Sequence, residues 1–245
     1  MTVATRVALV TGCSRSAGLG FEICRQLGQL GFTTVLTARD AAKATALSAE
    51  LRDQGLDVHG YSLDITQPDS VRAMLQMISE RFGRLDMLIN NATGATSSAD
   101  PVSTADLEVA RHVLDVTLLG TWRMTQTVLP LLLKSDAGRI VNVSSSAGLH
   151  SDPALGLRSQ WTGRPAYGIA KAALNALTVK FATELRDTDI KINAVCPGLT
   201  ATYPGMAEAG ARPVTAAARG IIWAATLAND GPSGGFYRDG QLESW

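Results

Sequence analysis

The sequence predicts a single α/β domain with a parallel β-sheet covered by helices on both faces. The first observation is that short apolar, β-branched runs alternate with segments of helical periodicity along nearly the whole chain. The second is a glycine-rich loop at residues 12–20, directly after the first such run. The third is that polar residues follow several runs where open α/β sheets bind ligands, at the carboxyl ends of strands. No linker or repeat divides the chain, so we expect one domain over residues 1–245.

The composition is typical of a soluble globular protein, with 46% hydrophobic and 18% charged residues. The 22 basic residues balance 22 acidic ones, so no basic excess favours a nucleic-acid or anionic-membrane partner. The cysteine and histidine spacings argue against a disulfide framework and a metal site. We see no signal peptide and no apolar run of transmembrane length, and therefore expect a cytoplasmic location.

The first strand is predicted at residues 7–10, and a helix from Phe21 to Leu30 follows the glycine loop. Glycines let backbone N–H groups approach a pyrophosphate, and the helix N-terminus adds a partial positive charge. The alternative is a plain turn between a strand and a helix. The order of strand, glycine loop and helix favours dinucleotide binding.

The second strand, at residues 33–37, is followed by Ala38, Arg39 and Asp40. Arg39 lies about twenty residues past the glycine loop, where this type of fold binds the adenosine ribose. A cation there suits the 2′-phosphate of NADP(H), and Arg15 in the loop is a second candidate cation. An acidic residue would instead suit NAD, but we interpret Asp40 as the N-cap of a helix over residues 41–54.

A third strand is expected from Val58 to Leu63, with Asp64 at its end. Residues 66–69 resemble a capping box that starts a helix running through Phe82. The fourth strand, at residues 87–89, ends in Asn90-Asn91-Ala92, which places polar groups at the ligand-binding edge of the sheet.

One long helix is expected from a cap in residues 103–106 to about Leu133, with Gly120 and Pro130 as candidate bends. The fifth strand, at residues 139–143, precedes Ser144-Ser145-Ser146.

Residues 149–165 are expected to form an irregular loop before a helix from Ala166 to Leu185. The sixth strand spans residues 190–195. A segment rich in small residues, 199–212, is expected to be mobile, and a helix over 216–227 and a short edge strand at 236–237 complete the chain.

Tyr167 and Lys171 are four residues apart on the predicted helix, so their side chains share one face. A nearby ammonium favours the phenolate and lowers the tyrosine pKa, which suits proton transfer to a carbonyl oxygen. The alternative is a surface or half-buried pair without chemistry, and the spacing alone favours that alternative.

These features together resemble the short-chain dehydrogenase/reductase family over nearly the full length of the chain. The resemblance rests on Thr11-Gly12, Gly18, Gly20, Asp64, Asn90-Asn91-Ala92, Ser145, Tyr167, Lys171 and Pro197-Gly198, in the family's order. Residues 37–40 and 234–240 are similar to the NADPH-dependent carbonyl reductase branch. The resemblance implies a Rossmann-type, doubly wound sheet of about seven strands. It also implies hydride transfer between NADP(H) and a carbonyl or alcohol.

The resemblance also implies a role for each site residue. Tyr167 would be the general acid/base, and Lys171 would lower its pKa and bind the nicotinamide ribose. The Ser145 hydroxyl would hydrogen-bond the reacting oxygen. Thr117 stands where the family usually has asparagine, and it is a further catalytic candidate. The implied cofactor-binding residues are Gly12, Ser14, Arg15, Gly18, Leu19, Gly20, Arg39, Asp64, Ile65, Asn91, Ala92, Tyr167, Lys171, Pro197 and Gly198, with no metal ligand.

Three positions depart from the family pattern. Two extra residues separate Gly12 from Gly18, so the loop must bulge. Thr93 replaces the expected glycine, which follows one position later as Gly94, and Thr117 is the third departure. Divergent enoyl reductases of the family also have a longer loop, but they space the tyrosine and lysine more widely.

We expect a mostly apolar, carbonyl-type substrate, with a pocket formed by residues 93–101, 149–165 (including Trp161) and 199–212. The family pairs subunits through the helices at 106–133 and 166–185, which implies a homodimer or homotetramer. Two alternatives remain: reduction of an imine or enone or another unusual biosynthetic step, and an NADP(H)-binding sensor or partner protein with weakened catalysis.

Overall fold

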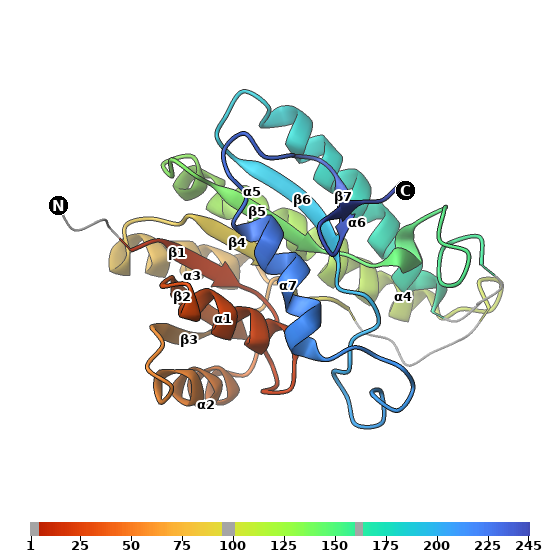
Figure 1. Cartoon of the computed structure of the whole chain (residues 1–245), viewed down its shortest axis with the longest axis horizontal. Helices are drawn as coiled ribbons and strands as arrows, with labels where there is room; N and C mark the ends of the chain where they lie inside the picture. Colours follow the sequence, from red (N-terminus) through yellow and green to blue (C-terminus); the bar gives the residue numbers. More distant parts are fainter. Residues whose placement is uncertain (1–4, 95–100, 160–163) are drawn as a thin grey trace.

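The computed structural model of the chain describes residues 5–94, 101–159 and 164–245. Their strands form one sheet in the order β3-β2-β1-β4-β5-β6-β7-β8 (Figure 1). All neighbouring strands are parallel except β7 and β8. The strands are β1 (Val7–Val10), β2 (Thr33–Ala38), β3 (Val58–Ser62), β4 (Met87–Asn90), β5 (Arg139–Val143), β6 (Lys191–Cys196), β7 (Phe236–Arg238) and β8 (Gln241–Leu242). The predicted parallel sheet is therefore confirmed.

The eighth strand exceeds the expected number of about seven. β8 pairs antiparallel with β7 across a two-residue turn formed by Asp239 and Gly240. Both residues have positive φ angles, 51° and 78°, as a type I′ hairpin turn requires. An Asp-Gly pair is a strong hairpin signal, so this small strand was predictable from the sequence.

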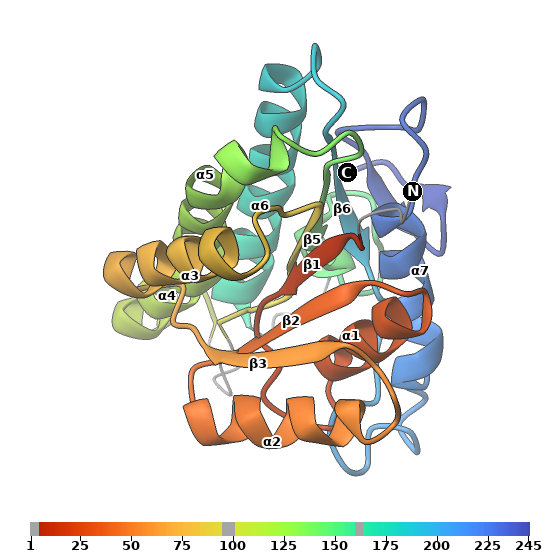
Figure 2. The same cartoon turned by 90° about the vertical axis from the view of Figure 1, so that its left-hand side faces the viewer.

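Helices cover both faces of the sheet, as Figure 2 shows: α1, α2 and α7 lie on one side and α3 to α6 on the other. The helices are α1 (Leu19–Gln29), α2 (Ala41–Arg52), α3 (Pro68–Arg81), α4 (Leu107–Leu114), α5 (Thr121–Leu132), α6 (Pro165–Glu184) and α7 (Val214–Ala225). Side chains of β1 alternate between the two layers: Ala8 and Val10 join the core under α1, and Leu9 joins the core under α5 and α6. This two-sided burial explains why β1 is a continuous apolar run.

The long helix predicted up to Leu133 is interrupted. Asp106 caps α4 by accepting a hydrogen bond from the backbone N–H of Glu108 at 2.8 Å. A π-helical segment, η1 (Asp115–Gly120), then joins α4 to α5. Of the two candidate bends, Gly120 lies at the end of this segment, whereas α5 continues past Pro130.

Two predicted helix caps have different outcomes. Asp40 caps α2, since its carboxylate accepts a hydrogen bond from the Lys43 N–H at 3.1 Å. The capping box expected before α3 is wrong, because the N-cap Gln67 makes no side-chain cap bond. The Thr66 hydroxyl instead donates to the Asp64 carboxylate at 2.7 Å and stabilises the turn after β3.

Candidate active site

The glycine loop lies directly against the segment that follows β4. A Cβ atom on Gly12, whose φ is +75°, would lie 2.6 Å from the Ala92 Cα atom. One on Gly20 would lie 2.7 Å from the Asn91 Nδ2 atom. Gly12 therefore lets the two loops pack backbone to backbone, and Gly20 leaves room for the Asn91 side chain, at the point where the strand order reverses between β1 and β4.

Hydrogen bonds join the same two loops. The Thr11 hydroxyl accepts from the backbone N–H groups of Asn91 at 3.1 Å and Ala92 at 3.0 Å. The Asn91 amide donates to the carbonyls of Thr11 at 2.8 Å and Gly12 at 3.1 Å. Asn90 instead points into the core, where it donates to Asn142 at 2.9 Å. The structure thus brings Thr11 and Gly12, after β1, together with Asn91 and Ala92, after β4. Asn90 is buried and hydrogen-bonds within the core.

The two extra residues of the glycine loop form a compact turn. The Gly18 N–H donates to the Arg15 carbonyl at 3.0 Å, and the Cys13 N–H ties the loop to the Thr37 carbonyl at 2.7 Å. Ser14 is exposed. Helix α1 begins at Leu19, and its N-cap Gly18 offers no side chain to the first N–H groups. Those N–H groups and the helix dipole suit a phosphate group.

The residues predicted to bind the adenosine end lie after β2 and β3. Arg39 is exposed at the tip of β2. The Asp64 carboxylate accepts from the Thr66 N–H at 2.9 Å, so it shapes the turn after β3. The Ile65 side chain is buried in the core, and its carbonyl accepts from Arg123 at 2.6 Å. Ile65 and Arg39 therefore stay candidate cofactor-binding residues, the first with a buried side chain and the second with an exposed one.

Lys171 is anchored beneath the candidate tyrosine. Its ammonium donates to the carbonyl of Val143, the last residue of β5, at 2.7 Å. Only 2% of Lys171 is exposed, and burial lowers its pKa to about 7. The nitrogen lies 5.5 Å from the centre of the Tyr167 ring. The predicted pair is therefore adjacent, but the ammonium bonds to the backbone.

The pKa of the Tyr167 phenol is raised above its usual value because its surroundings desolvate it. The Ser145 hydroxyl, by hydrogen bonding, and the Arg164 charge act in the opposite direction without cancelling this effect. That Lys171 lowers the pKa of Tyr167 stays a prediction, because here its ammonium is bound to the Val143 carbonyl and desolvation keeps the Tyr167 pKa raised. The phenol consequently stays protonated, which is the state that a proton donor requires.

The three serines after β5 have separate positions. Ser144 is buried and donates to the Asn175 side chain at 2.6 Å. Ser146 is buried and contacts the Cys196 sulfur at 3.4 Å. Ser145 is partly exposed, and its hydroxyl accepts from the Ala147 N–H at 3.2 Å. Ser145 is therefore the serine that the structure leaves beside Tyr167, in agreement with the choice made from the sequence.

Two glycines let the turn after β5 touch helix α6. This turn is the short 3-10 helix η2 (Ser146–Gly148). A Cβ on Gly148 would lie 2.5 Å from the Ala172 nitrogen, and one on Gly168 would lie 2.9 Å from the Ala147 carbonyl oxygen. This close backbone contact brings Ser145 and Tyr167 together although they belong to different elements.

Thr117 supports the loop after β4. It is fully buried in η1, and its hydroxyl accepts from the Gly94 N–H at 3.0 Å and pairs with the Thr93 hydroxyl at 3.2 Å. A Cβ on Gly94 would lie 2.6 Å from the Val113 Cα atom, which explains why glycine occurs here. Two of the three departures, at Thr93-Gly94 and at Thr117, thus form one local arrangement that joins η1 to this loop.

Cys196 is a further residue of the site, and no sequence motif pointed to it. Its buried sulfur accepts from the Gly198 N–H at 3.4 Å and lies 3.9 Å from the Arg238 guanidinium. Its sulfur makes a minor electrostatic contribution that raises the pKa of both Tyr167 and Lys171. The available signal was its position directly before Pro197-Gly198, which are partly exposed at the end of β6.

The predicted substrate loops are described only in part. Residues 95–100 and 160–163, which include Trp161, lie outside the described residues. The base of the 199–212 segment is closed, since the Arg212 N–H donates to the Leu199 carbonyl at 2.9 Å. Arg212 also forms an ion pair with Asp239 at 2.8 Å. The segment expected to be mobile is therefore a loop whose two ends are held together.

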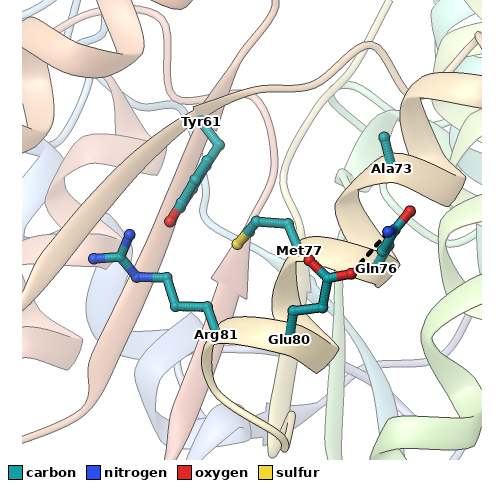
Figure 3. Close-up of a pocket in the computed structure, with 6 residues that line it drawn as sticks. All are labelled: Tyr61, Ala73, Gln76, Met77, Glu80 and Arg81. Atoms are coloured by element: carbon teal, nitrogen blue, oxygen red, sulfur yellow. Dashed lines mark hydrogen bonds between the residues drawn. The ribbon is translucent and has the colours of Figure 1, made fainter.

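A separate open hollow of about 490 Å³ lies between β3 and α3 (Figure 3). Tyr61, Met77 and Arg81 border it, and it shares no residue with the strand-end site. In the part of the chain that the structure describes, no group of three His, Cys, Asp or Glu side chains could hold a metal ion. Within the same residues, no helix has the length and apolarity needed to cross a bilayer.

Comparisons with known proteins agree with this geometry. The family model described as short chain dehydrogenase matches residues 6–210. The (+)-neomenthol dehydrogenase of Capsicum annuum is 30% identical, with 96% of each chain aligned. The carbonyl reductase (NADPH) 1 of Sus scrofa is 31% identical over 100% of this chain and 96% of the reductase.

Among solved structures, a metagenomic short-chain oxidoreductase in complex with NADP superposes with a TM-score of 0.77 and 28% identity. The alignment covers 97% of this chain and 99% of that one. Family model, relatives and fold therefore agree with the arrangement of strand ends and helix α6. The chain belongs to the short-chain dehydrogenase family and is an oxidoreductase of that family.

Proposed function

We propose that this protein is an NADPH-dependent carbonyl reductase that converts a ketone or aldehyde to an alcohol, or catalyses the reverse. The observation that carries the proposal is the grouping of Ser145, Tyr167 and Lys171 where β5 ends against α6. This group lies on the sheet that also carries the glycine loop, at the edge where such folds bind dinucleotides.

NADP(H) is the cofactor that fits the residues present. The N-terminus of α1 suits the pyrophosphate, and the exposed Arg39 suits a 2′-phosphate. Arg15, in the bulged loop after β1, is a second candidate cation. The carbonyl reductase relative is named for NADPH and the metagenomic oxidoreductase was solved with NADP, which supports NADP(H) over NAD(H). When bound, this cofactor supplies the hydride.

The remaining chemistry belongs to side chains of the chain. Negative charge develops on the carbonyl oxygen as hydride arrives at carbon, so that oxygen needs a hydrogen-bond donor and a proton. Ser145 supplies the hydrogen bond in our proposal, and Tyr167 supplies the proton from its phenol, whose raised pKa keeps it protonated. Lys171 would hold the nicotinamide ribose. Thr117 would act through the loop it supports.

The substrate class and the setting are also proposals. We propose a mostly apolar carbonyl compound, bound beside the loop of residues 199–212, and a cytoplasmic homodimer or homotetramer. Apolar side chains on η1, α5 and α6 are exposed, namely Leu119, Trp122 and Ile169. These elements are the ones through which the family pairs its subunits.

The proposal is tested by following NADPH absorbance with a panel of apolar ketones and aldehydes. We expect oxidation of NADPH with at least one member, and slower oxidation of NADH at equal concentration. The absence of turnover across a broad panel, with tight NADPH binding, would replace this function by a cofactor-sensing role.

A second candidate reaction is reduction of an imine or enone. The specific observation behind it is the linked arrangement of Thr93, Gly94 and Thr117, which differs from the family pattern next to the site. Adding cyclic imines and enones to the same panel separates the two reactions, because turnover restricted to them contradicts carbonyl reduction.

A further inference from the structure

Arg15 and Tyr203 are stacked on one another. The Arg15 guanidinium carbon lies 3.7 Å from the centre of the Tyr203 ring, well within the range of a cation–π contact. Arg15 belongs to the glycine loop between β1 and α1, and Tyr203 to the loop that follows β6. Figure 1 shows these two loops side by side. The contact therefore joins the proposed cofactor loop to a loop proposed to border the substrate.

Hydrogen-bonded turns hold the backbone on both sides of the Arg15–Tyr203 contact. The bulge in the glycine loop is closed by the Gly18 N–H, which donates to the Arg15 carbonyl at 3.0 Å. Tyr203 begins a turn in which its carbonyl accepts from the Met206 N–H at 3.3 Å. The base of its loop is held by Arg212, which is paired with Asp239. Arg15 and Tyr203 thus each lie in a hydrogen-bonded turn.

A guanidinium that stacks on an aromatic ring contacts the ring only through the face of its plane. Its N–H donors lie in the plane of the group and still point outward, so a stacked arginine can bind a phosphate with a fork of hydrogen bonds. An arginine on an exposed loop loses rotamer freedom when it binds an anion. A ring that already holds the side chain removes most of that loss, and Tyr203 is 58% exposed, so it is not itself a core residue.

We propose that Tyr203 is a positioning residue that preorganises Arg15 to bind the 2′-phosphate of NADP(H). Tyr203 thereby contributes to the preference for NADPH over NADH without touching the reacting atoms. This inference rests on the proposed function, because it requires the glycine loop to hold the cofactor. It assigns the extra length of that loop a purpose, which is to bring Arg15 onto the ring.

The test is a fluorescence titration of the purified enzyme with NADPH and with NADH. Tyr203→Leu removes the ring, and we expect it to raise the Kd for NADPH about fivefold, as loss of an exposed cation–π contact predicts. The Kd for NADH should stay within about twofold, since NADH has no 2′-phosphate. Tyr203→Phe keeps the ring and should bind NADPH within about twofold of the wild type.

A double-mutant cycle with Arg15→Met distinguishes positioning from a general effect of the loop. Once Arg15 is replaced, Tyr203→Leu should cause no further loss of NADPH affinity. Additive losses, unchanged NADPH affinity in Tyr203→Leu, or an equal loss for NADH would each overturn the proposal. Tighter NADPH binding by Tyr203→Leu would also overturn it, because the stack would then compete with the phosphate.

Two controls complete the experiment. Tyr61→Leu removes a tyrosine beside the hollow between β3 and α3, and its NADPH affinity should match the wild type. Thermal unfolding of every variant shows whether it is folded. A wild-type protein that binds neither nucleotide would contradict the proposed function itself, whereas normal wild-type binding with unaltered variants contradicts only the role of Tyr203.

Discussion

The Lys171 ammonium and the Val143 carbonyl form a 2.7 Å hydrogen bond at the end of β5. This bond holds a buried ammonium directly below Tyr167, and burial lowers its pKa to about 7. In the structure described here, the lysine is therefore readily deprotonated near neutral pH, while the tyrosine remains a phenol. Burial therefore acts on both side chains in the same way, since it favours the neutral form of each.

The first prediction concerns stability against pH. A lysine in an unfolded chain has a pKa of about 10.4, so the unfolded state binds more protons than the folded state between pH 7 and about 10. Stability should therefore rise with pH across this window, with Lys171 contributing on the order of 1 kcal/mol per pH unit. Urea unfolding of the wild type and Lys171→Met at pH 7, 8 and 9 measures this slope.

Lys180→Met is the matched control for this measurement, because Lys180 is exposed on the same helix. Its unfolding free energy should parallel that of the wild type at each pH. If Lys171→Met also parallels the wild type, Lys171 does not titrate as the structure indicates.

The second prediction concerns Asp86, which is buried before β4. Its carboxylate accepts hydrogen bonds from the Val7 N–H at 2.8 Å, the Ser135 hydroxyl at 2.6 Å and the Arg84 guanidinium at 2.6 Å. Burial alone would raise its pKa, but these bonds outweigh burial and lower it. Asp86→Asn should lower the free energy of unfolding by about 2–4 kcal/mol at pH 7.

The pH dependence of this contribution has the opposite sense to that of Lys171. Because the Asp86 pKa is lower in the folded state, its ionised carboxylate stabilises the fold above a pH of about 4. This stabilisation is lost as the pH falls through the folded-state pKa. The difference between the wild type and Asp86→Asn should therefore shrink in acid. Asp69→Asn, at an exposed carboxylate of α3, is the control and should leave the urea midpoint unchanged.

The third prediction compares two glycines that have left-handed backbone. Gly31, with φ +84°, has nothing within 4 Å of an added Cβ, so Gly31→Ala should cost only the backbone strain of about 1–2 kcal/mol. Gly12→Ala adds a contact of 2.6 Å with the Ala92 Cα atom to the same strain. It should lower the melting temperature further and abolish NADPH binding. Equal melting temperatures for the two variants would contradict the loop packing described.

The sheet and the positions of most candidate site residues were predictable because their signals are local. Buried parallel strands are short apolar runs, and the residues that follow them meet at one edge. This logic located Asn91 after β4 and Ser145 after β5 without knowledge of the structure. Asp40 was recognised as an N-cap for the same reason, since its bond reaches only to Lys43.

Other features depend on contacts between distant segments and carry no local signal. The 3.6-residue periodicity of an α-helix cannot reveal the π-helical segment around Thr117. Thr117 in this segment accepts a hydrogen bond from the distant Gly94 N–H. The effective charge of Lys171 depends on burial, and the spacing to Tyr167 does not report burial. The Arg15–Tyr203 stack joins two residues that are far apart in the sequence. The hairpin at Asp239-Gly240, by contrast, has a local signal, because an Asp-Gly pair is typical of a tight hairpin turn.

The fourth prediction concerns assembly. Trp122 on α5 and Ile169 on α6 are 43% and 50% exposed, and they lie on the two helices through which the family pairs its subunits. Light scattering should give a dimer or tetramer for the wild type and a monomer for Trp122→Glu. Leu30→Glu, at the C-terminal end of α1 on the other face, is the control and should not alter the mass. A monomeric wild type would contradict the proposed assembly.

The central claim is that the Tyr167 phenol donates the proton that accompanies hydride transfer. The most direct test is NADPH oxidation by Tyr167→Phe with the best carbonyl substrate, alongside Tyr61→Phe as a control that removes a phenol elsewhere. We predict that kcat falls at least about a hundredfold for Tyr167→Phe, as loss of a general acid implies. NADPH affinity should stay within about threefold and Tyr61→Phe should match the wild type. Equal kcat values for Tyr167→Phe and the wild type would contradict the assignment.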